Sequence, residues 1–439
     1  MKKLLIVSPN FPPLNAADMH RVRTSLPFFR QFGWDPHVLC VAPAYLEGLI
    51  EPRLLSTVPS DIPITRTAAL PLRVSRCLGF GNVALRAFAH LYAAGADIIA
   101  RERIDLTYFS TTMFAAMPLG RLWKWRFGTP YVLDMQDPWV SDRPAPVRLP
   151  KHRQATLMHR LLESFTMGGV DGLIAVSAAY HEALRRRYPW IAENDCATLP
   201  FGANAADFEE ASRAVWLNAF FERDDGQRHA VYVGAMSADM RLPARILFRA
   251  ARKVQALQPA LPKLRLTFVG TSYAPAGRQT KSAEPEAATE GMGDAVQEWP
   301  DRVPYFDALR LMQDSHFIIV LGSSDQRYTP SKLHQAFEAR RPIIAVVHEH
   351  SPVLELLRRS RAGVFVTFRG PEDIEASAAQ LSQSLLPLIE REPRAPAIDW
   401  SVLEGYRADR LAGRQCELFD SILQSHAVTG RVASAPHGG

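Results

Sequence analysis

Cysteine is scarce in this chain and occurs in no metal-binding pattern. The 439 residues contain four cysteines, Cys40, Cys77, Cys196 and Cys416, and no two of them form a Cys-x-x-Cys pair. The thirteen histidines show no zinc-ligand spacing such as His-Glu-x-x-His. These absences argue against a disulfide framework and a zinc site, and they favour the reducing cytoplasm as the location.

Long apolar runs are also missing. The opening segment MKKLLIVSPNFPP has two lysines and an apolar run that ends at Val7, too short for the apolar core of a signal peptide. No uninterrupted apolar span of 18 residues follows, so a membrane-spanning helix is not expected. Residues 2–7 are instead predicted to form the first strand of a parallel sheet.

A strong charge of either sign is absent as well. The 51 basic and 45 acidic residues leave a net charge of +6, and no stripe of lysine and arginine suggests a nucleic-acid footprint. This mild excess favours phosphorylated ligands or an anionic membrane surface. The motifs Gly-x-Ser-x-Gly, Walker A and Gly-x-Gly-x-x-Gly are not found where their chemistry requires them.

What the sequence does contain is a double series of strand-like and helix-like segments. Short apolar segments near residues 2–8, 35–42, 104–110, 129–137 and 170–177 each precede a helical pattern. The pattern breaks over residues 205–229, and a second series follows with segments near 230–236, 264–270, 316–322, 342–347 and 362–368. This alternation predicts two consecutive α/β domains, each a doubly wound parallel sheet, facing one another across a cleft. The Pro-, Ala-, Gly- and Glu-rich residues 272–298 are predicted to be a mobile insertion.

One stretch, residues 317–347, predicts an anion site. A buried strand is followed by Tyr-Thr-Pro-Ser-Lys, a helix and a second apolar strand. Pro330 suits the first turn of a helix, and free N–H groups at such a start attract anions, to which Lys332 adds a positive charge. The alternative is an ordinary capped helix with a surface lysine that binds nothing.

The order of several segments resembles the family-four-like glycosyltransferases of the GT-B architecture. The matching stretches are SPNFPPLNAADMHRVRTSLPFFRQFGWDPHVL, TPYVLDMQDPWV, VDGLIAVSAAYHEALRRRYP, LPFGAN and YTPSKLHQAFEARRPIIAV. This resemblance implies an acceptor-side domain over residues 1–205 and a nucleotide-sugar-binding domain over 206–398. It also implies a closing helix over 399–426 that packs on the first domain. Residues 427–439 are expected to be a disordered tail.

The resemblance implies a transfer of sugar from a nucleotide diphosphate sugar, with a UDP- or GDP-sugar as donor. Retention at the anomeric carbon, no cofactor and no obligatory metal are implied with it. The acceptor is expected to be a glycan or a lipid-linked precursor of a bacterial surface polysaccharide. Residues 121–128, RLWKWRFG, interleave cations with tryptophans, which suits peripheral contact with the inner face of the membrane. Ordinary packing of these tryptophans on the sheet is the alternative.

The resemblance also implies a set of donor-binding residues in the second domain. They are Gly234, Arg241, Arg327, Thr329, Ser331, Lys332 and Gln335. Arg327 and Gln335 occupy two positions where the family has glutamate, and Glu338 lies one helical turn beyond Gln335. Gln335 is expected to contact the donor ribose and Glu338 to be structural. The alternative for Arg241 is a solvated residue at a helix start, and the alternative for Arg327 is a residue that merely lines the loop.

In the first domain, Gln136 and Asp137 are the candidate catalytic residues. They follow a buried strand and stand where the family has histidine, so they would contact the acceptor hydroxyl or act as general base. The alternative for Asp137 is a cap of the next turn, since Asp-Pro is common turn chemistry. Two rival functions remain open: a sugar-nucleotide or glycan-binding protein without turnover, and a sugar-nucleotide epimerase.

Overall fold

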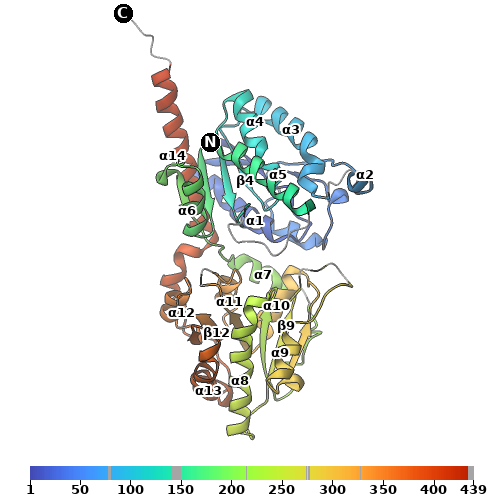
Figure 1. Ribbon diagram of the computed structural model, residues 1–439, viewed down its shortest axis with the longest axis vertical. Coiled ribbons are helices and arrows are strands. Elements are labelled where there is room, and N and C mark those ends of the chain that lie inside the picture. Colours follow the sequence, from blue (N-terminus) through green and yellow to red (C-terminus); the bar gives the residue numbers. More distant parts are fainter. Residues whose placement is uncertain are drawn as a thin grey trace, which may run out of the picture. The chain divides into compact units, whose positions relative to one another are not determined.

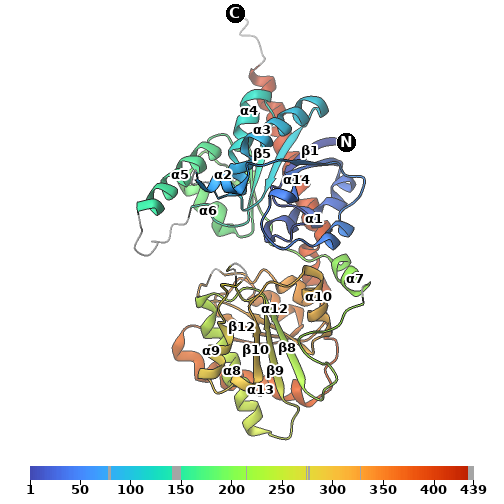
Figure 2. The ribbon, with the colours of Figure 1, turned by 90° about the vertical axis from the view of Figure 1, so that its right-hand side faces the viewer.

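The chain folds into two compact units. The computed structural model describes all residues except 78–80, 141–149, 214, 273, 275, 276, 327 and 434–439. Unit 1 comprises Met1–Gly202 and Ala408–Gly439, and unit 2 comprises Ala203–Arg407. Figures 1 and 2 show the chain from two sides, with the helices of each unit arranged around its own sheet.

Unit 1 is built on a seven-stranded parallel sheet. Its strands are β1 (Lys2–Val7), β2 (Trp34–Val41), β3 (Ile64–Thr67), β4 (Leu106–Ser110), β5 (Tyr131–Met135), β6 (Gly172–Ala175) and β7 (Cys196–Thr198). They lie in the order β3-β2-β1-β4-β5-β6-β7, so Val7 pairs with Leu39 on one side and with Phe109 on the other. The order reverses between β1 and β4, which is where ligands of open α/β sheets bind.

Helices cover both faces of this sheet. They are α1 (His20–Ser25), α2 (Leu72–Cys77), α3 (Val83–Glu102), α4 (Pro118–Phe127), α5 (Pro150–Met167), α6 (Ala178–Arg187) and α14 (Ala408–Ala433). Alternate strand residues enter two separate cores, because successive side chains of a strand point to opposite faces. Leu5 and Val7 face the layer of α3 and α4, whereas Leu4 and Ile6 face α1 and α14.

The C-terminal helix α14 belongs to unit 1. The ring of Phe419 meets that of Trp34 edge-on at 5.5 Å, and Arg414 donates to the Thr198 carbonyl at 2.9 Å. Residues 399–407 precede this helix within unit 2. Helix α14 runs on to Ala433, so residues 427–433, predicted to be disordered, are helical because they contain no proline and a single glycine. The last six residues of the predicted tail lie outside the described part.

Unit 2 contains a six-stranded parallel sheet. Its strands are β8 (Arg228–Val233), β9 (Leu264–Val269), β10 (Val296–Trp299), β11 (Phe317–Leu321), β12 (Ile343–His348) and β13 (Gly363–Phe368). They lie in the order β10-β9-β8-β11-β12-β13, which again reverses beside the first strand. The flanking helices are α7 (Ala205–Arg213), α8 (Arg241–Leu257), α9 (Ala283–Thr289), α10 (Tyr305–Asp314), α11 (Leu333–Glu338), α12 (Leu354–Ser360) and α13 (Ile374–Glu390).

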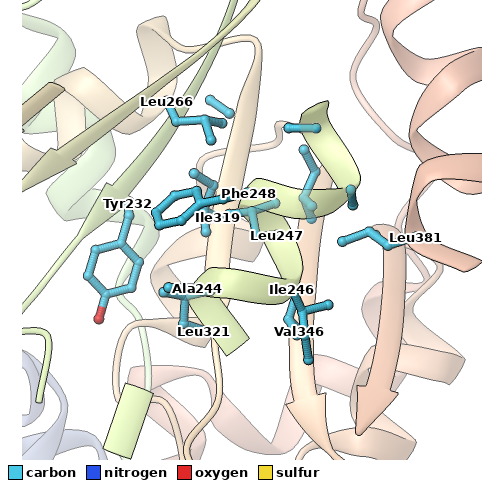
Figure 3. Packing of buried hydrophobic residues seen from close by; sticks show 14 of the residues in the cluster. Tyr232, Ala244, Ile246, Leu247, Phe248, Leu266, Ile319, Leu321, Val346 and Leu381 are labelled. Atoms are coloured by element: carbon cyan, nitrogen blue, oxygen red, sulfur yellow. The ribbon is translucent and has the colours of Figure 1, made fainter. Parts of the chain in front are cut away.

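The largest apolar core of unit 2 lies between this sheet and helices α8 and α13. Figure 3 shows Leu266, Ile319 and Val346 of the strands pointing toward Phe248 of α8 and Leu381 of α13. These side chains are all buried. The two predicted doubly wound α/β sheets are therefore present.

The predicted mobile insertion over residues 272–298 is wrong. Its described residues include α9 and most of β10, an edge strand paired with β9. The buried carboxylate of Glu298 organises them, because it accepts hydrogen bonds from Thr271 Oγ1 at 2.5 Å and from the backbone N–H groups of Ala283 at 2.8 Å and Glu284 at 3.0 Å. Those N–H groups open α9 and have no partner within the helix. One buried glutamate thus orders a segment whose composition is typical of a loop.

No membrane-spanning helix is expected from the sequence, yet helix α3 has the length and hydropathy of one. Among the described helices, it alone is long and apolar enough to cross a membrane, with a mean hydropathy of 1.3 over 18 residues. Core helices of soluble proteins pass the same test, and Ala87, Leu91 and Ile99 of α3 pack in the core of unit 1.

Candidate functional site

In unit 1, a buried ion pair lies at the carboxyl edge of the sheet. Arg21 Nε lies 2.8 Å from Asp134 Oδ2, and the same guanidinium donates to the Leu199 carbonyl at 2.7 Å. Ser110 Oγ also donates to Asp134 Oδ2, at 2.7 Å. Burial raises the pKa of Asp134, although Arg21 and the hydroxyl donor partly offset this effect. Arg21 is therefore buried and held inside the unit by Asp134 and the Leu199 carbonyl.

Gln136 belongs to the same internal network. Its amide Nε2 donates to the Asp18 carbonyl oxygen at 2.9 Å and to Ser110 Oγ at 3.0 Å. The Asp18 carboxylate is itself buried, and it accepts from Thr111 Oγ1 at 2.8 Å and from Asn10 Nδ2 at 3.1 Å. Residues from the ends of β1, β4 and β5 thus form one hydrogen-bonded cluster, which directs the Gln136 amide into the protein.

Asp137, the next residue, is placed differently. Its side chain is exposed, and among the described residues none forms a hydrogen bond or ion pair with it. Partial desolvation raises the pKa of its carboxylate, and the negative charge of Asp18 raises it further. Asp137 therefore offers open acceptor positions close to the switch point of the sheet, where a substrate hydroxyl could bind.

In unit 2, two predicted donor-binding residues come together at the corresponding edge. Gly234 follows β8 with φ at +143°, a conformation that residues with a side chain rarely adopt. A Cβ atom built on Gly234 would lie 3.8 Å from Lys332 Cγ, so the lysine stem runs beside this glycine. The loop after β8 and the loop after β11 therefore meet at the switch point between these strands.

Lys332 carries its charge in an unusual environment. Although the residue is exposed as a whole, desolvation lowers the pKa of its ammonium to about 8, and the positive charge of Arg302 contributes. Among the described residues, no carboxylate forms an ion pair with Lys332. Two cations close together without a neutralising carboxylate on Lys332 favour the binding of an anion.

The helix start predicted at Pro330 lies three residues later. Helix α11 begins at Leu333 and is six residues long, while Ser331 and Lys332 form a turn closed by the hydrogen bond from Leu333 N to the Pro330 carbonyl. A helix of fewer than two turns has few aligned peptide dipoles, so its start attracts an anion weakly. The side chain of Lys332, rather than the helix start, is the main anion-binding feature of this segment. Thr329 is half-buried and Ser331 is exposed beside it.

The remaining predicted donor residues are spread around this edge. Gln335 is half-buried on α11, and burial raises the pKa of Glu338 one turn further on, with Arg340 and Arg407 opposing the shift. Arg241 begins α8, where its Nε lies 3.6 Å from Glu286 Oε1 while the side chain stays 57% exposed. Arg327 lies outside the described residues.

Sequence reasoning missed Asp18 and Arg302. Asp18 lies inside the Pro-rich loop that follows β1, and Arg302 follows β10, a strand whose segment was interpreted as a mobile insertion. In the described part of the chain, no group of three or more His, Cys, Asp or Glu residues is placed to hold a metal ion.

Part of the first unit matches the sequence model of a known family. Residues 28–202 match the family described as the glycosyl transferase 4-like domain. The search of curated proteins gave no match.

Solved structures share the fold over nearly the whole chain. The Anabaena protein HepE in complex with UDP and glucose is 14% identical with a TM-score of 0.54, covering 98% of this chain and 100% of that one. A UDP-forming trehalose-phosphate synthase from Burkholderia xenovorans is 14% identical with a TM-score of 0.57, covering 99% and 100%. A Listeria monocytogenes protein described as a UDP-N-acetylglucosamine 2-epimerase is 11% identical with a TM-score of 0.53, covering 97% and 98%.

At these identities the solved structures are evidence for the fold alone. The family match and the shared fold confirm the resemblance on which the site prediction depends. Residues 28–202 thus match the glycosyl transferase 4-like domain, and the chain as a whole shares the GT-B fold of these solved structures.

Proposed function

We propose that this protein is a glycosyltransferase that moves a sugar from a nucleotide diphosphate sugar to a glycan or lipid-linked acceptor. The observation that carries the proposal is the meeting of Gly234 and Lys332 at the switch point of the unit 2 sheet. The glycine lets the backbone turn and gives room for a ligand, and the lysine supplies a cation without a described carboxylate partner. Structures of the same fold have been solved with UDP and with UDP-glucose, which favours a UDP-sugar as donor.

The chemistry requires charge stabilisation above all. The bond between the anomeric carbon and the diphosphate oxygen breaks and leaves the nucleoside diphosphate, the acceptor hydroxyl oxygen forms the new bond to that carbon, and the hydroxyl proton passes to a base, for which we propose Asp137. Lys332, with Arg302 and Arg241, would hold the diphosphate and offset the charge that grows on it. Gln335 would accept a hydrogen bond from the ribose.

On the acceptor side we assign Asp137 to the substrate hydroxyl. Its exposed carboxylate has open acceptor positions, and its raised pKa suits a group that exchanges a proton. We assign Gln136 a structural role beside Asp137, because its amide nitrogen donates to Asp18 and Ser110 inside the unit. Retention at the anomeric carbon and independence of metal ions are parts of this proposal.

A panel of nucleotide sugars tests it directly. The protein would be incubated with UDP- and GDP-sugars, with and without simple glycan acceptors, and release of the nucleoside diphosphate would be measured. Release with at least one donor is the expected result. Tight binding of a nucleotide sugar without any release would instead support a binding protein that has lost turnover.

A sugar-nucleotide epimerase is the second alternative to a glycosyltransferase, because the Listeria protein described as a UDP-N-acetylglucosamine 2-epimerase has the same fold. The two reactions give different products from UDP-N-acetylglucosamine. A transferase or hydrolase releases UDP and a sugar, whereas a 2-epimerase of that substrate would change the configuration at carbon 2. Proton NMR of the reaction mixture distinguishes these products, and the coupling constant at the anomeric carbon also reports retention or inversion.

For the acceptor and the location, we propose a bacterial surface polysaccharide precursor and a cytoplasmic protein at the inner face of the membrane. The mild positive charge of the chain supports this location, since the cytoplasmic leaflet is anionic. Transfer to a lipid-linked acceptor, compared with the same glycan free in solution, would test the acceptor class.

A further inference from the structure

An exposed apolar stripe crosses two helices of unit 1. Leu157 and Leu161 lie one turn apart on α5 and are 59% and 62% exposed, and Phe165 follows one turn later. The ring of Trp125 on α4, 64% exposed, meets Phe165 edge-on with the centroids 5.2 Å apart. We name these four residues the α4–α5 stripe. Figures 1 and 2 show α3, α4 and α5 close to one another in unit 1.

The stripe leads into a groove between α3 and α4. The groove has a volume of about 520 Å³ and includes Trp125 in its wall. Its lining residues are Phe88, Ala89, Tyr92, Leu122, Trp125 and Arg126. Phe88 and Tyr92 of α3 thus continue the apolar surface begun by the stripe.

Cations surround this apolar surface. Helix α4 carries Arg121, Lys124 and Arg126 and no carboxylate. The Arg121 guanidinium lies over the rings of both Trp125 and Phe165, at 4.8 Å and 4.7 Å from their centroids. Arg126 donates to the Tyr92 hydroxyl at 3.3 Å.

The nearby carboxylates do not neutralise this surface. Glu163 of α5 is turned inward, where it accepts hydrogen bonds from Tyr188 and from the backbone of Val140. Asp171 is bound to Lys124 at 2.6 Å. Arg121 and Arg126 therefore keep their positive charge at the border of the apolar surface.

We propose that the α4–α5 stripe and the adjoining groove dock this protein on an anionic lipid bilayer. The proposal deepens the membrane location given under the proposed function and rests on it. Exposed leucines and a tryptophan would enter the headgroup boundary, while Arg121 and Arg126 would contact lipid phosphates. Charge complementarity favours a bilayer, because a basic rim around an apolar stripe matches phosphates above acyl chains.

Sedimentation with lipid vesicles tests this surface. Full-length protein would be mixed with vesicles of phosphatidylcholine alone and with vesicles that also contain phosphatidylglycerol, and the bound fraction would be measured. The expected result is binding to the anionic vesicles that weakens with salt. Trp125→Ala should lower the partition coefficient by about tenfold or more, since a largely exposed indole loses its burial in lipid. Arg126→Ser should lower it by about fivefold.

Trp400→Ala is the matched control. Trp400 is also an exposed tryptophan with a guanidinium over its ring, that of Arg340 at 5.4 Å, but it belongs to unit 2. This variant should bind vesicles like the parent protein. Equal losses for Trp125→Ala and Trp400→Ala would overturn the proposal, as would no binding of the parent protein to anionic vesicles.

A second copy of the chain is the competing occupant. Sedimentation velocity would then show self-association that Leu161→Gln abolishes, without any vesicle binding, and this outcome would also overturn the proposal. Calorimetric titration with UDP in the absence of lipid tests the proposed donor site independently of the proposed docking surface. If the parent protein binds vesicles but not UDP, the donor site is refuted and the docking surface stands. If it binds UDP but not anionic vesicles, the docking surface is refuted and the donor site stands.

Discussion

Lys332 combines three properties at the scale of a single residue: it stands beside Gly234, the pKa of its ammonium is lowered to about 8, and it has no carboxylate partner among the described residues. We expect Lys332→Ala to weaken UDP binding about tenfold to a hundredfold while the fold is kept, because a charge-assisted contact is worth about 1.5–3 kcal/mol. Isothermal calorimetry measures this. Lys263→Ala, an exposed lysine at the amino end of β9, is the control and should bind like the parent. If Lys332→Ala binds UDP with the affinity of the parent protein, the UDP phosphates do not contact Lys332.

The pKa of Lys332 predicts how UDP affinity changes with pH. Its pKa of about 8 in the free protein would rise when an anion binds, so below pH 8 the lysine is charged in both states and contributes fully. Above pH 8 the free lysine is neutral and binding must take up a proton, so affinity should fall by up to about tenfold for each pH unit. Calorimetry between pH 7 and pH 9 should show this fall in the parent. A pH dependence that persists in Lys332→Ala would assign the titration to another group.

Gln335 and Glu338 share one face of α11, and we expect only Gln335 to contact the ribose. Gln335→Glu should keep or tighten UDP binding, because a charged acceptor forms a hydrogen bond worth about 1.5–3 kcal/mol against about 0.5–1.5 kcal/mol for a neutral one. Glu338→Gln should leave affinity nearly unchanged, since this carboxylate faces the charges of Arg340 and Arg407. The reverse result, with binding lost only in Glu338→Gln, would show that the contact lies one turn further along the helix.

Among the elements, α9 and β10 depend on the single carboxylate of Glu298. Glu298→Gln should destabilise this segment by about 1–3 kcal/mol, because an amide NH₂ would face N–H donors at the start of α9. Hydrogen exchange of residues 283–299 measures the effect locally. The control is Glu355→Gln on α12, whose carboxylate is 63% exposed and pairs with Arg358 at the surface, where ion pairs contribute little. Equal exchange in both variants would contradict the capping role.

At the scale of the whole molecule, we expect the protein to catalyse sugar transfer without a metal ion. Arg241, Arg302 and Lys332 bring positive charge to the proposed donor edge of unit 2, and this charge could take the place of a metal cation in holding a diphosphate. We therefore expect UDP release from a UDP-sugar to be unchanged by EDTA. Loss of activity in EDTA and its return on adding magnesium or manganese would contradict this expectation.

The sequence by itself determined most of the architecture. Alternation of apolar strands with helical segments is a local pattern, so it predicted two doubly wound sheets, and the ordered matches predicted the glycosyltransferase family. The sequence also predicted that Asp137 and Lys332 lie at the carboxyl edges of their sheets, because each follows a strand and ligands of such sheets bind at those edges.

Only the tertiary structure decided which candidates are available to a substrate. Gln136 and Asp137 are adjacent in the chain, yet Gln136 is buried by contacts with Asp18 of the loop after β1 and Ser110 of β4, whereas Asp137 is exposed. The meeting of Gly234 with Lys332 and the ordering of α9 by Glu298 likewise join residues distant in sequence. Local patterns report backbone periodicity, whereas burial and hydrogen-bond partners depend on how the strands are ordered in the sheet. That order is set by packing across the whole unit.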